Sequence, residues 1–152
     1  MKTTILVGAL VALATGLAIG VQSTITSRVG SLIGDVRTGL ITNFLGGVLA
    51  GTVILFLILR NGPQSWKISG VIVGATALSG LIGILIISGI SFSLQRAGIA
   101  AGLATVIVGQ LVLSMIIDTF GIGGVEAIPF SPQRLLGLLV MGLGVFLLLP
   151  RS

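Results

Sequence analysis

Hydrophobic residues run along this chain in five long segments, and short stretches of polar residues and glycine separate them. The segments do not alternate between apolar and polar positions, as the strands of a membrane β-barrel would. Each is long enough for a helix to cross, or nearly cross, a hydrocarbon core of about 30 Å. We therefore predict an all-α membrane protein, a single transmembrane domain over residues 1–152, with five helices at about 3–26, 38–59, 66–93, 97–117 and 132–149.

Breaker residues and charges set the predicted ends of these helices. The polar stretch 27–37 separates the first two helices, and the sequence Arg-Asn-Gly-Pro at 60–63 ends the second, because proline lacks a backbone donor. Gln-Arg at 95–96 predicts a tight turn after the third helix. Ser-Pro at 131–132 suits the N-cap and first position of the fifth helix, which is the shortest.

The composition fits a membrane protein and narrows the possible chemistry. Charged residues make up 7% of the chain, against about 25% in globular proteins, and glycine occurs 24 times. The chain has no cysteine or histidine, and its only carboxylates are Asp35, Asp118 and Glu126. These groups are too few for a transition-metal site, and no phosphate-binding loop or catalytic serine set occurs. We expect no metal, no cofactor and no enzymatic activity.

Eight basic residues give the chain a formal charge of +5, but they lie singly beside apolar segments and form no patch for nucleic acid. In a five-helix bundle they divide evenly between the two sides of the membrane. Because lysine and arginine bias sets orientation, a balanced chain can insert both ways, which would give an antiparallel homodimer. The alternative is a single orientation fixed by local context. The two groups are Lys2, Arg60, Lys67 and Arg134, and Arg28, Arg37, Arg96 and Arg151.

Small residues recur at four-residue spacing on several predicted helices, and such stripes let another backbone approach closely. The first helix has the longest stripe. We assign these positions to packing, either between helices of one chain or across a dimer. They are Gly8, Ala12, Gly16 and Gly20 on the first helix, Gly47 and Gly51 on the second, Gly70 and Gly74 on the third, and Gly98 and Gly102 on the fourth.

Polar residues within the membrane tend to face a bundle interior or a water-filled cavity, because exposing them to lipid is costly. The strongest set is Gln110, Ser114 and Asp118, whose i, i+4, i+8 spacing places them along one face of the fourth helix. We predict Gln110 and Ser114 as substrate-binding groups and Asp118 as a gating or titrating group. For Asp118, capping a helix end or pairing with an arginine is an equal alternative.

Two further amides lie at predicted helical positions. Asn43 falls early in the second helix and Gln22 late in the first, with Arg28 beyond it. We predict Asn43 and Gln22 as flanking substrate contacts and Arg28 as a second gating or titrating group, while each amide also suits a helix–helix hydrogen bond. An uncharged set of this kind favours a neutral or zwitterionic small metabolite over a lipophilic cation.

The fourth helix also carries a recognisable sequence. Residues 109–121, GQLVLSMIIDTFG, followed by RLLG at 134–137, resemble the signature of the YdcZ-type family of the drug/metabolite transporter superfamily. Weaker matches, at Gln22 with 27–28, at 43–51 and from 66 to 74, extend the resemblance over nearly the whole chain. The chain has Thr26 where family members often have asparagine, and its first helix lacks the glutamate of small multidrug resistance proteins.

The resemblance implies a five-helix half-transporter in a bacterial-type inner membrane, of the kind found as dual-topology chains, as oppositely oriented pairs or as fusions. Together with the residues, it predicts a multi-pass transporter that works as an antiparallel homodimer and binds substrate near the membrane midplane. Its partners would be the lipid bilayer, a second copy and a small-molecule substrate, with no nucleic acid. The alternatives are a passive channel and an accessory or scaffold subunit of a larger complex.

Overall fold

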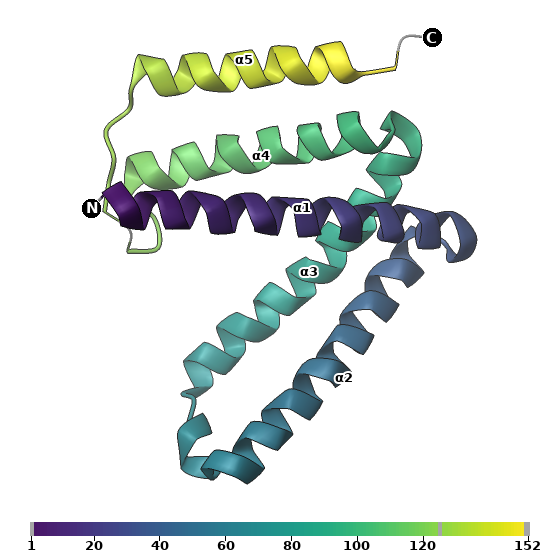
Figure 1. Ribbon diagram of the computed structural model, residues 1–152, viewed down its shortest axis with the longest axis vertical. Helices are drawn as coiled ribbons and strands as arrows, with labels where there is room; N and C mark the ends of the chain where they lie inside the picture. The colour runs from purple at the N-terminus through teal and green to yellow at the C-terminus, as the bar shows by residue number, and fades with distance from the viewer. Residues whose placement is uncertain (1, 125, 151–152) are drawn as a thin grey trace. The chain divides into compact units, whose positions relative to one another are not determined.

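The computed structural model describes residues 2–124 and 126–150, which form five α-helices and one short 3₁₀ helix (Figure 1). The chain divides into two compact units, one up to Phe92 and one from Ser93 onward. The first contains α1, α2, the 3₁₀ helix η1 and most of α3, and the second contains the end of α3 with α4 and α5. The helices are α1 (Lys2–Ile33), α2 (Asp35–Asn61), η1 (Pro63–Trp66), α3 (Gly70–Ala97), α4 (Ile99–Phe120) and α5 (Pro132–Leu148).

The length and composition of the helices agree with an all-α membrane protein. Four helices of the described chain, α1 to α4, are long and apolar enough to cross a bilayer. The fifth, α5, is also apolar but has 17 residues. At 1.5 Å per residue it is about 26 Å long, a few ångströms short of a typical hydrocarbon core.

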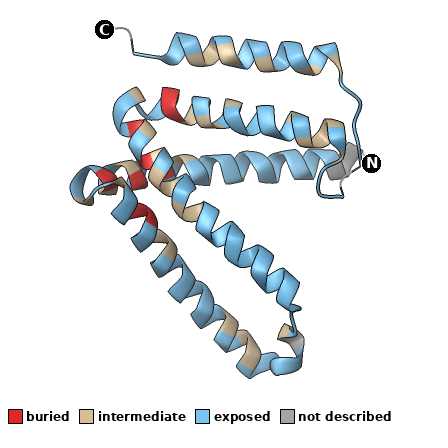
Figure 2. Ribbon diagram, turned by 180° about the vertical axis from the view of Figure 1, so that it is seen from behind, coloured by how far each residue is buried: buried red, intermediate tan, exposed pale blue. Residues whose placement is uncertain are grey.

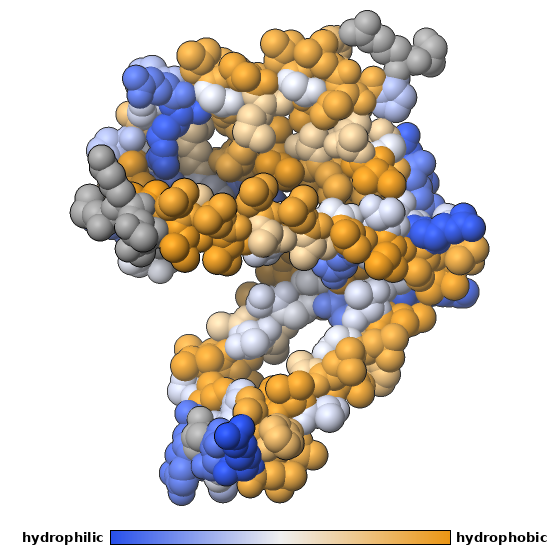
Figure 3. Space-filling view, viewed as in Figure 1, coloured by the Kyte–Doolittle hydropathy of each residue, from blue (hydrophilic) through white to orange (hydrophobic). Residues whose placement is uncertain are grey.

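Most apolar side chains of the described residues point outward. Most of the length of the helices is coloured as exposed in Figure 2. The hydrophobic residues that are buried in the described part of the chain are Leu94 and Ala101, each 2% exposed, whereas side chains such as Leu59 and Phe44 are 77% and 69% exposed. Hydrophobic surface runs along the helices, and hydrophilic residues gather where helices end, as around η1 (Figure 3). A water-soluble chain would bury such surface, so this surface is suited to lipid.

Single glycines join consecutive helices, and they move two predicted boundaries. Gly34, with φ 89° and ψ 150°, separates α1 from α2, and Gly98, with φ 79° and ψ 162°, separates α3 from α4. Only glycine adopts this backbone region without strain. The predicted turn at 95–96 is therefore wrong, because α3 continues through Ala97, and Gly98 is a joint rather than part of a helical packing stripe.

Other helix ends also differ from the predicted ones. The stretch 27–33, expected to be a connection, is helical, because Ser27 and Arg28 do not break a helix and the first breaker is Gly34. The third helix begins at Gly70 instead of 66, since Pro63–Trp66 forms a 3₁₀ turn. The start of α5 at Pro132 is as predicted, but the Ser131 hydroxyl makes no cap hydrogen bond.

Helices α2 and α3 meet through a glycine. A Cβ placed on Gly39 of α2 would collide with Ser88 Oγ of α3, and it would lie 2.7 Å from the Ile84 carbonyl oxygen. Ser88 Oγ donates a hydrogen bond of 2.8 Å to that same carbonyl. The two backbones therefore approach as closely as glycine allows, and Gly39 is buried.

Polar contacts lie one turn to either side of Gly39. On one side, the hydroxyl of Ser91, which is fully buried, donates a hydrogen bond of 2.6 Å to Asp35 Oδ1. On the other, Asn43 Nδ2 donates to the Gly39 carbonyl, and its Oδ1 lies 3.1 Å from where a Cβ of Gly83 would be. Residues 35, 39 and 43 thus form one polar and small-residue face of α2 against α3.

Candidate functional site

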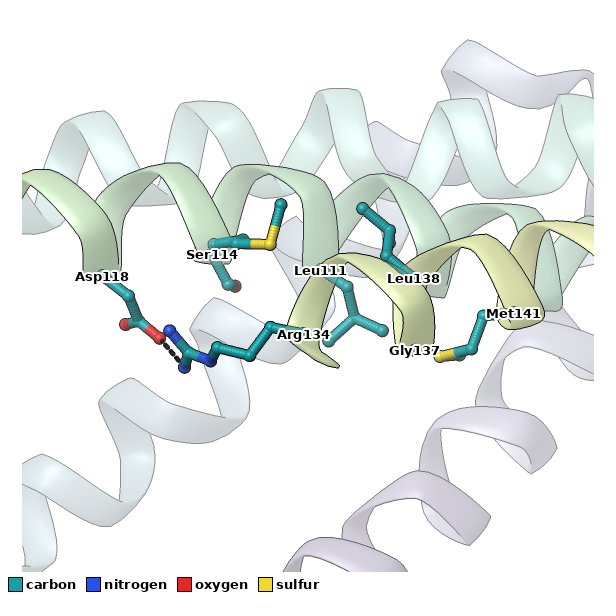
Figure 4. Close-up of a pocket in the computed structure, with 8 residues that line it drawn as sticks. Leu111, Ser114, Asp118, Arg134, Gly137, Leu138 and Met141 are labelled. Carbon is teal, nitrogen blue, oxygen red and sulfur yellow. Dashed lines mark hydrogen bonds and ion pairs between the residues drawn. The ribbon is translucent and has the colours of Figure 1, made fainter. Parts of the chain in front are cut away.

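A cavity of about 460 Å³ lies between α4 and α5 in the second unit. Figure 4 shows Asp118 from α4 and Arg134 from α5 reaching toward each other, with Leu111, Leu138 and Met141 farther along the two helices. The cavity therefore has a charged end, near the C-terminus of α4 and the N-terminus of α5, and an apolar wall that extends toward the middle of α4. It is lined by Leu111, Ser114, Met115, Asp118, Arg134, Gly137, Leu138 and Met141.

An ion pair lies at the charged end of this cavity. Arg134 Nη2 donates a hydrogen bond of 2.7 Å to Asp118 Oδ2, and the two side chains are 36% and 34% exposed. The backbone supports the pair, because Ile128 N–H donates to the Asp118 carbonyl at 2.9 Å and so ties the loop back to the end of α4. The structure therefore shows Asp118 paired with an arginine, which was one of the alternatives to a gating or titrating role.

The pair leaves hydrogen-bonding capacity unused. Arg134 Nη1 is buried and has no hydrogen-bond partner among the described residues. Asp118 Oδ1 likewise makes no hydrogen bond within residues 2–124 and 126–150. A buried donor without a partner is costly, by about 1–3 kcal/mol, so a group that accepts from Nη1 would gain that amount.

Only part of the predicted polar face of α4 lines the cavity. Ser114 lines the cavity with Asp118, whereas Gln110 is exposed and does not line it. Two other hydroxyls of α4 bond within the helix. Those of Thr105 and Thr119 donate to the carbonyl oxygens four residues earlier, at 2.8 and 2.7 Å. Neither Gln110 nor Ser114 makes a side-chain hydrogen bond to any described residue. Both are therefore available to a group from outside this unit.

The predicted residues of the first unit lie in two different places. Gln22 lines a second cavity, of about 450 Å³, with Thr26 and Thr42 as its other polar residues. Asn43 instead lies against α3 and bonds within its own helix. Arg28 is an exposed residue of α1 in this unit, whereas the ion pair made by Asp118 is with Arg134.

The sequence did not indicate that Arg134 and Asp35 bond to other polar groups. Arg134 is the third residue of α5, where the positive end of the helix dipole disfavours a cation. That placement calls for a nearby carboxylate, and Asp118 lies near the end of the preceding helix. Asp35 was expected in the connection at 27–37, but it is the first residue of α2 and accepts a hydrogen bond from Ser91, for which no role was predicted. Among the described residues, no three His, Cys, Asp or Glu side chains come together as a metal site would require.

Comparison with protein families gives one match that covers most of the chain. The model of a family described as "Putative inner membrane exporter, YdcZ" matches residues 7–147. The match agrees with the resemblance found in the fourth helix. Comparisons of the chain with curated proteins and with solved structures find no match.

Proposed function

Because the chain belongs to the YdcZ family of inner membrane exporters, we propose that it is a small dual-topology transporter whose two inverted copies form an antiparallel homodimer. The chain is a multi-pass protein of the inner membrane with apolar helices of spanning length. Each copy would supply one half of the transporter. A small neutral or zwitterionic metabolite would bind between the halves, and exchange of their conformations would open the site to each side in turn.

The observation that carries this proposal is the unsatisfied polar face of α4. Gln110 lies near the middle of α4 and makes no hydrogen bond to a described residue. An amide at that depth needs partners, because lipid offers none. A second copy of the chain or a polar substrate would supply them. Ser114, one turn away and also without a partner, extends the same requirement.

The small-residue positions support a second copy as a packing partner. A Cβ added at Gly8, Gly16 or Gly20 on α1 would meet nothing within 4 Å, and the same is true at Gly47 and Gly51 on α2. Within the first unit, these positions therefore pack against no other described residue. Close approach of another helix is the use that such stripes have in membranes. Ala12, between them on α1, is likewise exposed.

The remaining polar residues have subsidiary roles in this proposal. Gln22, with Thr26 and Thr42, would contact substrate from the first unit, and Asn43 would hold α2 against α3 beside it. The Asp118–Arg134 pair would act as a gate at one end of the α4–α5 cavity. Arg28, in the last two turns of α1, would be a second gating residue, in the first unit.

A comparison of all metabolites released by cells tests the proposal and can identify the substrate in the same experiment. Cells that overproduce the chain would be compared with cells that produce the double variant Gln110→Ala/Ser114→Ala at equal membrane levels. The matched control is Gln64→Ala, which removes an exposed amide in the turn after α2. The expected result is that particular neutral or zwitterionic metabolites accumulate in the medium with the native chain and with the control, but not with the double variant. The same metabolites at the same concentrations in the media of all strains would refute the proposal.

The same cells distinguish the two other functions. A passive channel would carry flux that does not saturate with substrate and would far exceed transporter turnover. An accessory subunit would export nothing alone and would co-purify with a larger membrane protein. Saturable export by the purified and reconstituted chain would exclude both.

A further inference from the structure

The α4–α5 cavity combines a net-neutral pair of opposite charges with an apolar wall. Asp118 and Arg134 occupy one end, and Leu111, Leu138 and Met141 lie along the helices beyond it (Figure 4). Its volume, about 460 Å³, falls within the range of small-molecule sites. Ser114 adds one hydroxyl that makes no hydrogen bond to a described residue.

The ion pair uses only part of the hydrogen-bonding capacity of its two groups. One guanidinium nitrogen, Arg134 Nη2, bonds one carboxylate oxygen, Asp118 Oδ2. Arg134 Nη1 is buried and without a partner, and Asp118 Oδ1 makes no hydrogen bond in the part of the chain that the structure describes. A ligand that brings both an acceptor for Nη1 and a donor for Oδ1 would satisfy both groups at once.

The sign of the charges selects the ligand class. A ligand with only a carboxylate could accept from Nη1, but it would add a second negative charge beside Asp118 in largely apolar surroundings. A ligand with only an ammonium group would likewise add a second positive charge beside Arg134. Either ligand leaves one charge uncompensated in a partly buried site, which is costly. A ligand with both charges satisfies both groups and keeps the site electrically neutral.

From this geometry we infer that the α4–α5 cavity binds a small apolar amino acid as its zwitterion. Arg134 binds the carboxylate, Asp118 binds the ammonium group, and the apolar side chain lies along Leu111, Leu138 and Met141. Arg134 is thereby a substrate-binding residue in addition to a gate. The inference rests on the proposed transport function and names its substrate class.

Binding of L-[³H]leucine to the purified chain in detergent tests the inference. Two competitors isolate each charge with the same branched tail: 4-methylpentanoate keeps the carboxylate, and 3-methylbutylamine keeps the ammonium group. We expect leucine to bind and each competitor to be about 10- to 100-fold weaker, the loss that accompanies one missing charged hydrogen bond. Absence of leucine binding, or competition by either analogue as strong as by unlabelled leucine, would overturn the inference.

Variants of the pair test the assignment of the residues. Arg134→Gln and Asp118→Asn should each weaken leucine binding by about 10- to 100-fold. The exchange Asp118→Arg/Arg134→Asp keeps one charge of each sign, so it should bind leucine better than either single variant and also serves as the check on folding. The control Arg60→Gln removes an exposed arginine at the end of α2 and should leave binding unchanged. Leucine binding that is insensitive to both single variants would contradict the assignment.

Failure of this inference can be told apart from failure of the proposed function. Export that depends on Gln110 and Ser114, without any leucine binding, would sink the zwitterion site and leave the transporter in place. Leucine binding to Arg134 and Asp118 in a chain that exports no metabolite would support the site and sink the transport function.

Discussion

Replacement of Gly39 by alanine tests the closest contact between α2 and α3. The added Cβ would collide with Ser88 Oγ and would lie 2.7 Å from the Ile84 carbonyl oxygen and 3.3 Å from Ser88 N. The serine hydroxyl could rotate away only by giving up its hydrogen bond to Ile84. The carbonyl belongs to the backbone of α3 and cannot rotate away, so the helices must separate.

The cost follows from known effects of overpacking, which are about 1–3 kcal/mol. For a chain of this size, about 1 kcal/mol corresponds to a change in Tm of about 2–4 °C. We therefore expect Gly39→Ala to lower the Tm by about 2–12 °C. The matched control is Gly46→Ala on the same helix, where nothing lies within 4 Å of the new Cβ. Alanine is the better helix former by about 0.5–1 kcal/mol, so the control should keep or slightly raise the Tm.

Thermal unfolding of the detergent-purified variants, followed by the loss of the monodisperse peak on size exclusion, measures this difference. The double variant Gly39→Ala/Ser88→Ala should recover part of the loss, because it removes the hydroxyl and leaves the Ile84 carbonyl contact. Equal Tm values for Gly39→Ala and Gly46→Ala would show that α2 and α3 are not in contact at this level. That result would refute the packing described for the first unit.

Two further substitutions probe the joint and the polar contact beside it. Gly34→Ala puts a side chain at φ 89° and should lower the free energy of unfolding by about 1–3 kcal/mol, whereas Gly46→Ala within α2 should not lower the Tm. Equal Tm values for the two variants would argue against the glycine joint. Ser91→Ala removes the donor to Asp35 and should lower the free energy of unfolding by about 1–2 kcal/mol, whereas Ser79→Ala, at an exposed position of α3, should leave it unchanged. An unchanged stability of Ser91→Ala would argue against the Ser91–Asp35 hydrogen bond.

The helical class of this protein could be predicted from its sequence because long apolar runs have few alternatives in a bilayer. The same runs define helix ends poorly. Ser27 and Arg28 are typical of a connection, but a helix tolerates them, and only the backbone of Gly34 requires a break. Gly98 was misassigned for the same reason, since a glycine at four-residue spacing from Gly102 fits both a stripe and a joint.

The site could be predicted in part. Spacing along one helix was sufficient to group Ser114 with Asp118, and the structure places both on one cavity. Contacts between helices depend on which faces meet, and one sequence does not specify them. Thus the sequence alone indicated only a basic residue beside an apolar segment at Arg134, although it pairs with Asp118. The glycines of α2 and α3 that meet a neighbouring helix, Gly39 and Gly83, were not among the predicted packing positions.

The most direct test of the antiparallel homodimer is the orientation of the chain in the inner membrane. The chain has no cysteine, so single variants Gln64→Cys, in the turn between α2 and α3, and Pro150→Cys, after α5, provide unique labels. Five spans would put these two positions on opposite sides. Intact cells would be labelled with a membrane-impermeant maleimide and compared with lysed cells. We expect a substantial fraction of both variants, near one half, to be labelled in intact cells, whereas complete labelling of one and none of the other would contradict the antiparallel homodimer.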